Sequence, residues 1–195
     1  DKGLKENLSI SFQFTFFLGF PIMLGLLGIA SSLVPWFFGS RFAPVTNLIV
    51  SMSPAVIMIG LSNIIGTQFL IPTHQHKQYT ISVISGAAVN IVLNTLLIPQ
   101  YNAWGAAIAS VISESVVALV QVIVVWRRIS ILHYFKRGWK SFVSGLIMFV
   151  IICIIRCFVR ADFICTIIQI IVGFFSYIIC SWSLGSKEIK DFLFR

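Results

Sequence analysis

Six long apolar runs dominate this sequence of 195 residues and restrict what it can fold into. About 20 consecutive apolar residues cross the hydrocarbon core of a membrane as a helix, and each run approaches or exceeds that length. Hydrophobic residues make up 58% of the chain and charged residues 10%, whereas soluble domains carry about 25% charged residues. The predicted fold class is therefore all-α, in a polytopic membrane protein of about six spans. The predicted spans are Leu8–Val34, Pro44–Ile71, Tyr79–Ile98, Ala103–Trp126, Phe142–Val159 and Phe163–Leu184.

Basic residues gather in alternate loops between these spans, and this pattern predicts their orientation. Of the 14 Lys and Arg residues, eleven fall in one set of loops and three in the other. Because positive residues mark the cytoplasmic side, we expect both ends of the sequence there, as an even number of spans requires. The net charge of +8 fits an anionic lipid surface better than nucleic acid, because the cations lie in short loops. The eleven are Lys2, Lys5, Lys77, Arg127, Arg128, Lys136, Arg137, Lys140, Lys187, Lys190 and Arg195, and the three are Arg41, Arg156 and Arg160.

The connection between the fourth and fifth spans is the longest and the most basic one. It predicts three parts of the chain: a four-helix part over residues 1–126, a basic cytoplasmic linker over 127–141, and a terminal helix pair with a cytoplasmic tail over 142–195. The sequence starts DKGLKENLSI, without a Met or a cleavable leader, so we expect it to begin inside a longer protein.

Three polar side chains lie near the middle of otherwise apolar spans. Asn90 and Asn94 are four residues apart on the third span and share a helix face, and Glu114 lies midway along the fourth. An amide or a carboxylate in hydrocarbon is costly unless it faces a partner or a water-filled cavity. We therefore predict that the three residues line a substrate or proton path. The alternative is that they pair with each other and hold helices together, as interhelical amides do.

Two further groups of residues have weaker signals. Asn63 and Gln68 bracket Gly66 near the end of the second span, where a polar, Gly-containing helix end predicts a gate or, alternatively, a plain helix terminus. Arg41 follows PWFFGS in an outer loop, where a guanidinium suits contact with a phosphate or an anionic sugar.

Catalytic motifs are missing from the sequence. It has no P-loop, no H-E-x-x-H, no G-x-S-x-G and no dinucleotide fingerprint, so we predict no enzyme, no catalytic residue and no cofactor. The four cysteines lie within apolar spans without a zinc spacing, so we predict no metal site.

The order of several short motifs resembles a known family. PWFFG (Pro35–Gly39), SNIIGTQFLIP (Ser62–Pro72), GAAVNIVLNTLLIP (Gly86–Pro99) and GAAIASVISE (Gly105–Glu114) are similar to the C-terminal half of bacterial polysaccharide flippases. These are the Wzx-type members of the multidrug/oligosaccharidyl-lipid/polysaccharide exporter superfamily. The resemblance covers about Leu8–Trp126, and the last two spans match in hydropathy alone.

The resemblance implies a fold and a function. Members of this family have fourteen helices in two lobes around a central cavity, so this chain would supply most of the second lobe. They flip an undecaprenyl-pyrophosphate-linked oligosaccharide across the bacterial cytoplasmic membrane by alternating access, for capsule, O-antigen or similar polymers. The partners that the resemblance implies are the lipid-linked oligosaccharide, the missing N-terminal lobe of the same protein, and polysaccharide polymerase and glycosyltransferases.

Three other functions stay open at this point. The first is a drug or cation exporter of the same superfamily, which would need a compact acidic site where this sequence offers only Glu114. The second is a membrane scaffold of polymer assembly that transports nothing. The third is a membrane-embedded glycosyltransferase or polymerase, for which Asp162 is the one isolated carboxylate candidate.

Overall fold

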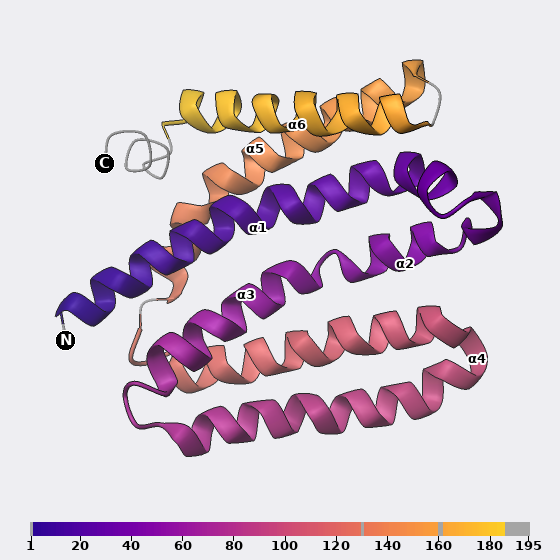
Figure 1. Ribbon diagram of the computed structural model, residues 1–195. Helices are drawn as coiled ribbons and strands as arrows, with labels where there is room; N and C mark the ends of the chain where they lie inside the picture. The colour runs from indigo at the N-terminus through magenta and orange to yellow at the C-terminus, as the bar shows by residue number, and fades with distance from the viewer. Residues whose placement is uncertain (1, 130, 160–161, 186–195) are drawn as a thin grey trace. The chain divides into compact units, whose positions relative to one another are not determined.

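The computed structural model describes residues 2–129, 131–159 and 162–185, and its elements are helices joined by short turns (Figure 1). In chain order they are α1 (Lys2–Phe37), the 3₁₀ turn η1 (Ser40–Phe42), α2 (Val45–Met52), α3 (Ala55–Ile65), the π-helix η2 (Gly66–Leu70), α4 (His76–Val125), α5 (Ile131–Phe158) and α6 (Phe163–Ser183).

The all-helical membrane fold predicted from the sequence is confirmed. Five stretches of the described chain are helical, long and apolar enough to cross a membrane. One of them, α4, contains a reversal at Asn102, where φ is 50° and ψ is −131°, and it supplies two of the six predicted spans as the two arms of a hairpin (Figure 1). The chain is therefore a multi-pass membrane protein.

The second predicted span consists of several pieces. α2 ends at Met52 and α3 begins at Ala55, because Pro54 lacks the N–H that would bond the carbonyl of Val50 four residues earlier. The Ser53 hydroxyl donates to that carbonyl at 2.9 Å, so the break leaves no bare acceptor there. The sequence predicted one span over Pro44–Ile71, and the structure shows two helices there, α2 and α3, followed by η2.

The predicted basic linker, residues 127–141, is largely helical, because α5 begins at Ile131. Ile131, Tyr134 and Gly138 are buried on one face of its first turns, which makes this segment an amphipathic helix rather than a loop. The division of the chain at residues 126 and 142 stays a prediction, as does the cytoplasmic position of the linker.

The structure divides into two compact units, whose boundaries fall within α1 and α5 and between α2 and α3. Unit 1 comprises residues 1–15 and 54–137, and unit 2 comprises 16–53 and 138–195. In unit 1 the start of α1 packs on the start of α5, where the Phe12 and Tyr134 rings stack with centroids 4.8 Å apart.

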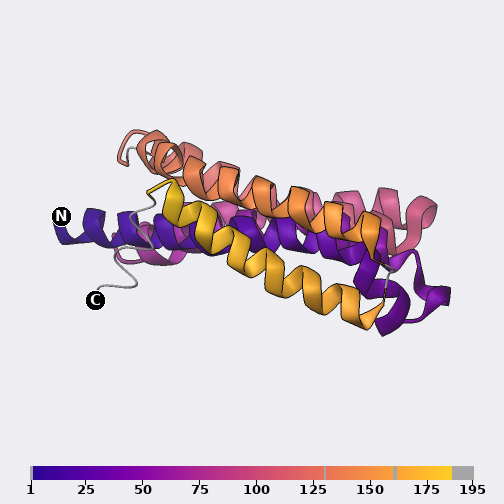
Figure 2. The ribbon, with the colours of Figure 1, turned by 90° about the horizontal axis from the view of Figure 1, so that it is seen from above.

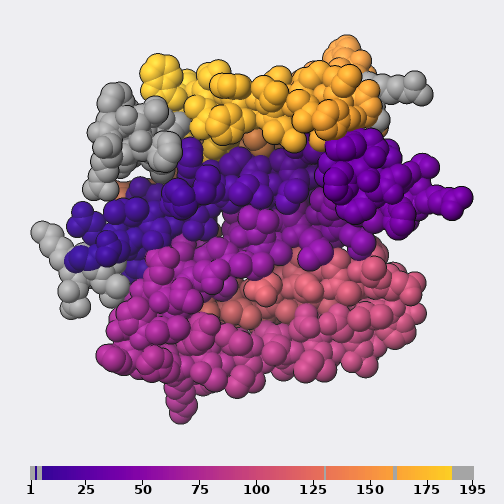
Figure 3. Space-filling model, in the orientation of Figure 1, coloured from indigo at the N-terminus to yellow at the C-terminus, as the bar shows by residue number. Residues whose placement is uncertain are grey.

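The hairpin of α4 is the largest element of unit 1, and its arms lie side by side (Figures 1 and 3). Gly86 on the first arm faces the second arm, where a Cβ at position 86 would lie 2.2 Å from Val117 Cγ2 and 3.1 Å from the Ser113 carbonyl oxygen. Small residues at such crossings let two membrane helices approach closely, and dispersion contacts then hold them together. The hairpin therefore depends on the absence of a side chain at this position.

Unit 2 packs the rest of α1 against α5 and α6, which run in opposite directions (Figures 1 and 2). Its core contains Leu24, Met148, Ile152 and Tyr177, all at most 5% exposed. Gly28 of α1 lies against Ile152, where an added Cβ would come within 2.7 Å of Ile152 Cγ2.

Replacing Gly86 with Val is expected to destabilise unit 1. The added side chain has to displace Val117 or push the arms of α4 apart, which costs about 1–3 kcal/mol for overpacking. The matched control is Ala88→Val, two residues away on an exposed side of the same arm. Thermal unfolding of the purified full-length protein should show a lower melting temperature for G86V than for A88V. Equal melting temperatures would show that the arms do not pack closely at Gly86.

Candidate functional site

The two asparagines of the predicted path are bonded to each other on the first arm of α4. The Asn94 Nδ2 donates to the Asn90 Oδ1 at 2.8 Å, and both residues are half-buried. The Oδ1 of Asn94 is buried and accepts no hydrogen bond from the described part of the chain. The Oδ1 of Asn94 is therefore available to accept a hydrogen bond from a group outside these residues.

Glu114 lies on the second arm and shares a pocket with Asn90. The pocket is about 320 Å³ in volume and lies between the arms beside Gly86. Ser113 also lines it, but its hydroxyl already donates to the Ala109 carbonyl at 2.6 Å. The remaining lining residues are small or apolar: Val83, Ala87 and Val117.

The structure thus brings the three predicted path residues together within unit 1. Asn90 and Glu114 line the same pocket, and Asn94 reaches it through its bond to Asn90. The pocket thus has a carboxylate and an amide among apolar lining residues. These two polar groups can bind the hydroxyl groups of a substrate or carry a proton. Their role in a substrate or proton path stays a prediction.

The predicted gate residues lie elsewhere in unit 1. Asn63 is on α3 and Gln68 is on η2, and both side chains are exposed and outside the lining of the α4 pocket. The backbone around Gln68 forms a π-helix, seen in the bond from the Ile71 N–H to the Gly66 carbonyl at 3.0 Å. Such turns recur at functional sites and pack less regularly than an α-helix. The gate stays a prediction, and its location coincides with this irregular turn.

A buried polar contact in unit 1 was missed by the sequence reasoning. The Gln121 side chain is 1% exposed, and its Nε2 donates to the Ser82 Oγ on the opposite arm of α4 at 3.1 Å. A Cβ added to Gly66 would lie 3.0 Å from the same nitrogen, so η2 also packs against this contact. Ser82 lies 20 residues before Asn102 and Gln121 lies 19 residues after it, so pairing the arms around that turn would have revealed the contact.

Arg41 lies in η1 within unit 2, and its side chain is exposed. The neighbouring Phe42 ring is also 55% exposed. The predicted anion contact of Arg41 stays a prediction.

Asp162, the candidate carboxylate of the glycosyltransferase alternative, caps a helix. Its Oδ1 accepts from the Cys165 backbone N–H at 2.8 Å at the start of α6. This bond gives the carboxylate a structural role. Within the described residues, His, Cys, Asp and Glu side chains form no group of three that could hold a metal ion.

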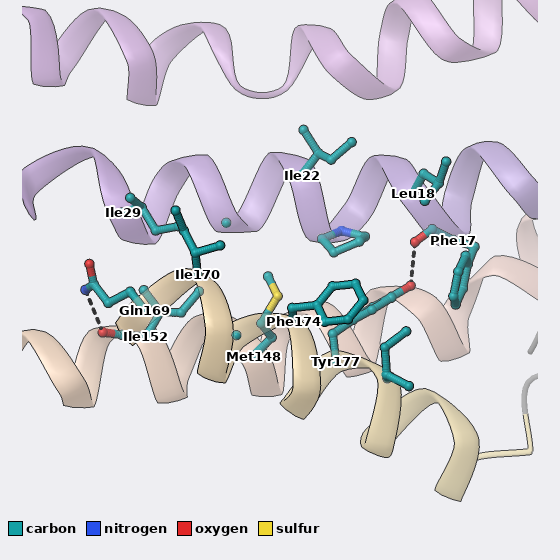
Figure 4. Close-up of a pocket in the computed structure, with 14 residues that line it drawn as sticks. Phe17, Leu18, Ile22, Ile29, Met148, Ile152, Gln169, Ile170, Phe174 and Tyr177 are labelled. Carbon is teal, nitrogen blue, oxygen red and sulfur yellow. Dashed lines mark hydrogen bonds between the residues drawn. The ribbon is translucent and has the colours of Figure 1, made fainter. Parts of the chain in front are cut away.

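A second pocket, of about 310 Å³, lies in unit 2 between α1, α5 and α6 (Figure 4). Its walls are almost entirely apolar, and the Gln169 amide is the polar group at one end. Gln169 is fully buried, and its Nε2 donates to the Ile152 carbonyl at 3.1 Å. Its Oε1 accepts no hydrogen bond from the described part of the chain.

Tyr177, on the wall of this pocket, compensates for a proline. Pro21 has no N–H, so the Phe17 carbonyl four residues earlier loses its helical partner. The Tyr177 hydroxyl donates to this carbonyl at 2.6 Å, as the dashed line in Figure 4 shows. The bond connects α6 to α1 at the Phe17 carbonyl, which has no helical N–H partner because of Pro21.

One solved structure is similar to nearly the whole chain. It is described as lipid II flippase MurJ in an inward closed conformation, and it matches with a TM-score of 0.79 at 21% sequence identity. The match covers 96% of this chain and 40% of that protein. The fold is that of a MurJ-like transporter lobe. The structure that it resembles is described as a flippase.

No family model matches the sequence, and no curated protein matches it. The resemblance to polysaccharide flippases therefore finds support in the fold of a lipid flippase, but not in the Wzx-type family itself.

The pairing of Tyr177 with Phe17 can be tested by a double-mutant cycle. Tyr177→Phe should destabilise the protein by about 1–2 kcal/mol, because the Phe17 carbonyl is left bare. In a Pro21→Ala background, the new N–H can bond that carbonyl, so the same Tyr177→Phe change should cost clearly less. The measurement is thermal unfolding of all four proteins in one detergent. An equal cost of Tyr177→Phe in both backgrounds would contradict the proposed compensation.

Proposed function

We propose that the chain is part of a flippase that moves a lipid-linked precursor across a membrane. The observation that carries the proposal is the fold, which matches a lipid II flippase over 96% of this chain. The α4 pocket adds a polar surface inside membrane-spanning helices, which a transported polar headgroup needs. This chain corresponds to 40% of the matched protein, so a second lobe would complete the central cavity.

The proposed substrate is an undecaprenyl-pyrophosphate-linked oligosaccharide repeat unit, moved by alternating access for polysaccharide biosynthesis. The motifs over Leu8–Trp126 support this choice, because they resemble the polysaccharide flippases. The rival substrate is lipid II, which the matched structure names. Polysaccharide polymerase and glycosyltransferases are the proposed partners, and the bacterial cytoplasmic membrane is the proposed location.

Within this function, Glu114 and Asn90 contact the polar part of the substrate or pass a proton, and Asn94 positions Asn90. The Asn94–Asn90 bond supports that positioning role. The exporter alternative is less well supported, because Glu114 is the one carboxylate that lines the pocket.

Glu114→Gln and the double variant N90L/N94L are expected to slow flipping by about tenfold or more. The first removes the carboxylate, whose hydrogen bonds are worth roughly 1.5–3 kcal/mol when it is charged, and the second removes two neutral amides, worth roughly 0.5–1.5 kcal/mol per hydrogen bond. The control is Thr95→Val, beside Asn94 but outside the pocket lining. The assay follows a fluorescent lipid-linked oligosaccharide and, separately, fluorescent lipid II in proteoliposomes containing the full-length protein.

The outcomes of that assay distinguish the functions. Movement of lipid II alone would show that lipid II is the substrate. Movement of neither lipid, with transport of a small cation in the same proteoliposomes, would favour the exporter. No movement of either lipid by a folded wild type, with polymer export unaffected by the variants in cells, would favour the scaffold.

The proposed orientation places the reversal of α4 outside the cell and the start of α4 inside. Cysteines introduced at Ala103 and at His76, both exposed, mark the two ends of the first arm. In a background without the native cysteines, a membrane-impermeant maleimide added to intact cells should label A103C but not H76C. Labelling of H76C alone would show that the orientation is the reverse of the proposed one.

A further inference from the structure

An exposed apolar stripe runs along the second arm of α4 and ends in an aromatic residue. Leu119, Ile123 and Trp126 are 59%, 65% and 57% exposed. Their spacing of four and three residues places them on one face of the helix. The rest of unit 1 does not cover this face.

Two arginines follow the stripe directly. Arg127 and Arg128 come after Val125, the last residue of α4, and both side chains are exposed. Neither guanidinium makes a hydrogen bond or an ion pair with another described residue. The carboxylate of Glu114 precedes Arg127 by 13 residues, a separation of about 20 Å along an α-helix. Among the described residues, the pair is therefore a positive charge without an ion-pair partner at the end of a membrane-spanning helix.

The arginines and the end of the stripe form a surface pocket. It has a volume of about 470 Å³ and is lined by Ile123, Val124, Trp126, Arg127 and Arg128. Guanidinium groups match the geometry of phosphate oxygens, and Trp rings favour the headgroup level of a membrane. The pocket thus combines groups for a phosphate with an apolar path leading away from it.

We propose that this surface binds an anionic phospholipid. Its phosphate lies on Arg127 and Arg128, its glycerol region on Trp126, and its acyl chains along Ile123 and Leu119. This site lies outside the α4 pocket and goes beyond the proposed function.

Charge complementarity selects this occupant. A zwitterionic lipid would bring its own cation beside the two guanidinium groups, which weakens the attraction, whereas each basic residue near a membrane surface adds affinity for an anionic headgroup. Another helix of the protein would bury Leu119 and Ile123, but it would have to supply carboxylates for Arg127 and Arg128.

Native mass spectrometry of the full-length protein, titrated with phosphatidylglycerol or phosphatidylcholine, tests the headgroup part. R127Q/R128Q should weaken binding of the first phosphatidylglycerol by about tenfold, with little effect on phosphatidylcholine. The control K77Q/K136Q removes the same charge from two exposed lysines of unit 1 that lie outside the pocket of Arg127 and Arg128. An equal loss in both double variants would overturn the site, because it would show a diffuse attraction.

The acyl-chain part needs a separate measurement. A bimane label on Ile123→Cys, in a background without native cysteines, should be quenched more strongly by brominated phosphatidylglycerol than by brominated phosphatidylcholine in proteoliposomes. R127Q/R128Q should abolish the difference. If neither lipid quenches the label, another part of the protein covers the stripe. If both lipids quench it equally, the lipid contact is unselective. Either result overturns the proposal. Neither experiment measures transport, so their failure leaves the proposed function untouched.

Discussion

The structure depends on two donors that pair the backbone carbonyls left free by Pro21 and Pro54 in a membrane environment. In hydrocarbon no water can satisfy a bare carbonyl, so each interruption of a helix needs its own donor. The Tyr177 hydroxyl supplies one for Phe17, below Pro21, and the Ser53 hydroxyl supplies one for Val50, below Pro54. The two solutions have different consequences. The donor to Phe17 comes from another helix and fastens α6 to α1, whereas the donor to Val50 is local and lies at the break that Pro54 makes between α2 and α3.

The site in unit 1 follows from close packing within one hairpin. Because Gly86 has no side chain, the first arm of α4 can meet Ser113 and Val117 of the second. Because the arms are close, Asn90 and Glu114 line the same pocket. Further along the arms, Gln121 forms a hydrogen bond with Ser82. Small residues and polar pairs therefore act together: the glycine sets the distance, and the hydrogen bond of Gln121 specifies the register of the arms.

The sequence was sufficient for features that depend on local composition. Apolar runs of about 20 residues predicted the spans, including the two that form the arms of α4. Features that depend on a distant partner were not predictable. The carbonyl released by Pro21 follows from the sequence, but the choice of Tyr177 as its donor does not. The helical start of α5 was missed for another reason, since its basic residues obscured the apolar spacing of Ile131 and Tyr134.

Buried polar groups in a protein normally have a hydrogen-bond partner. A few side-chain amide oxygens of this structure do not follow that rule within the described residues. The fold supplies donors to carbonyls beneath two prolines, yet the buried Oδ1 of Asn94 and Oε1 of Gln121 accept no hydrogen bond from the described residues. A buried acceptor without a donor is costly, so solvent or a bound molecule has to supply one. Both amides lie on α4, one bonded to Asn90 of the pocket and one packed against the π-helix η2. Gln75 and Gln169 carry the same kind of oxygen outside α4, so the need for a further donor is not confined to the pocket, and Gln121 meets part of its own requirement by bonding Ser82 across the arms.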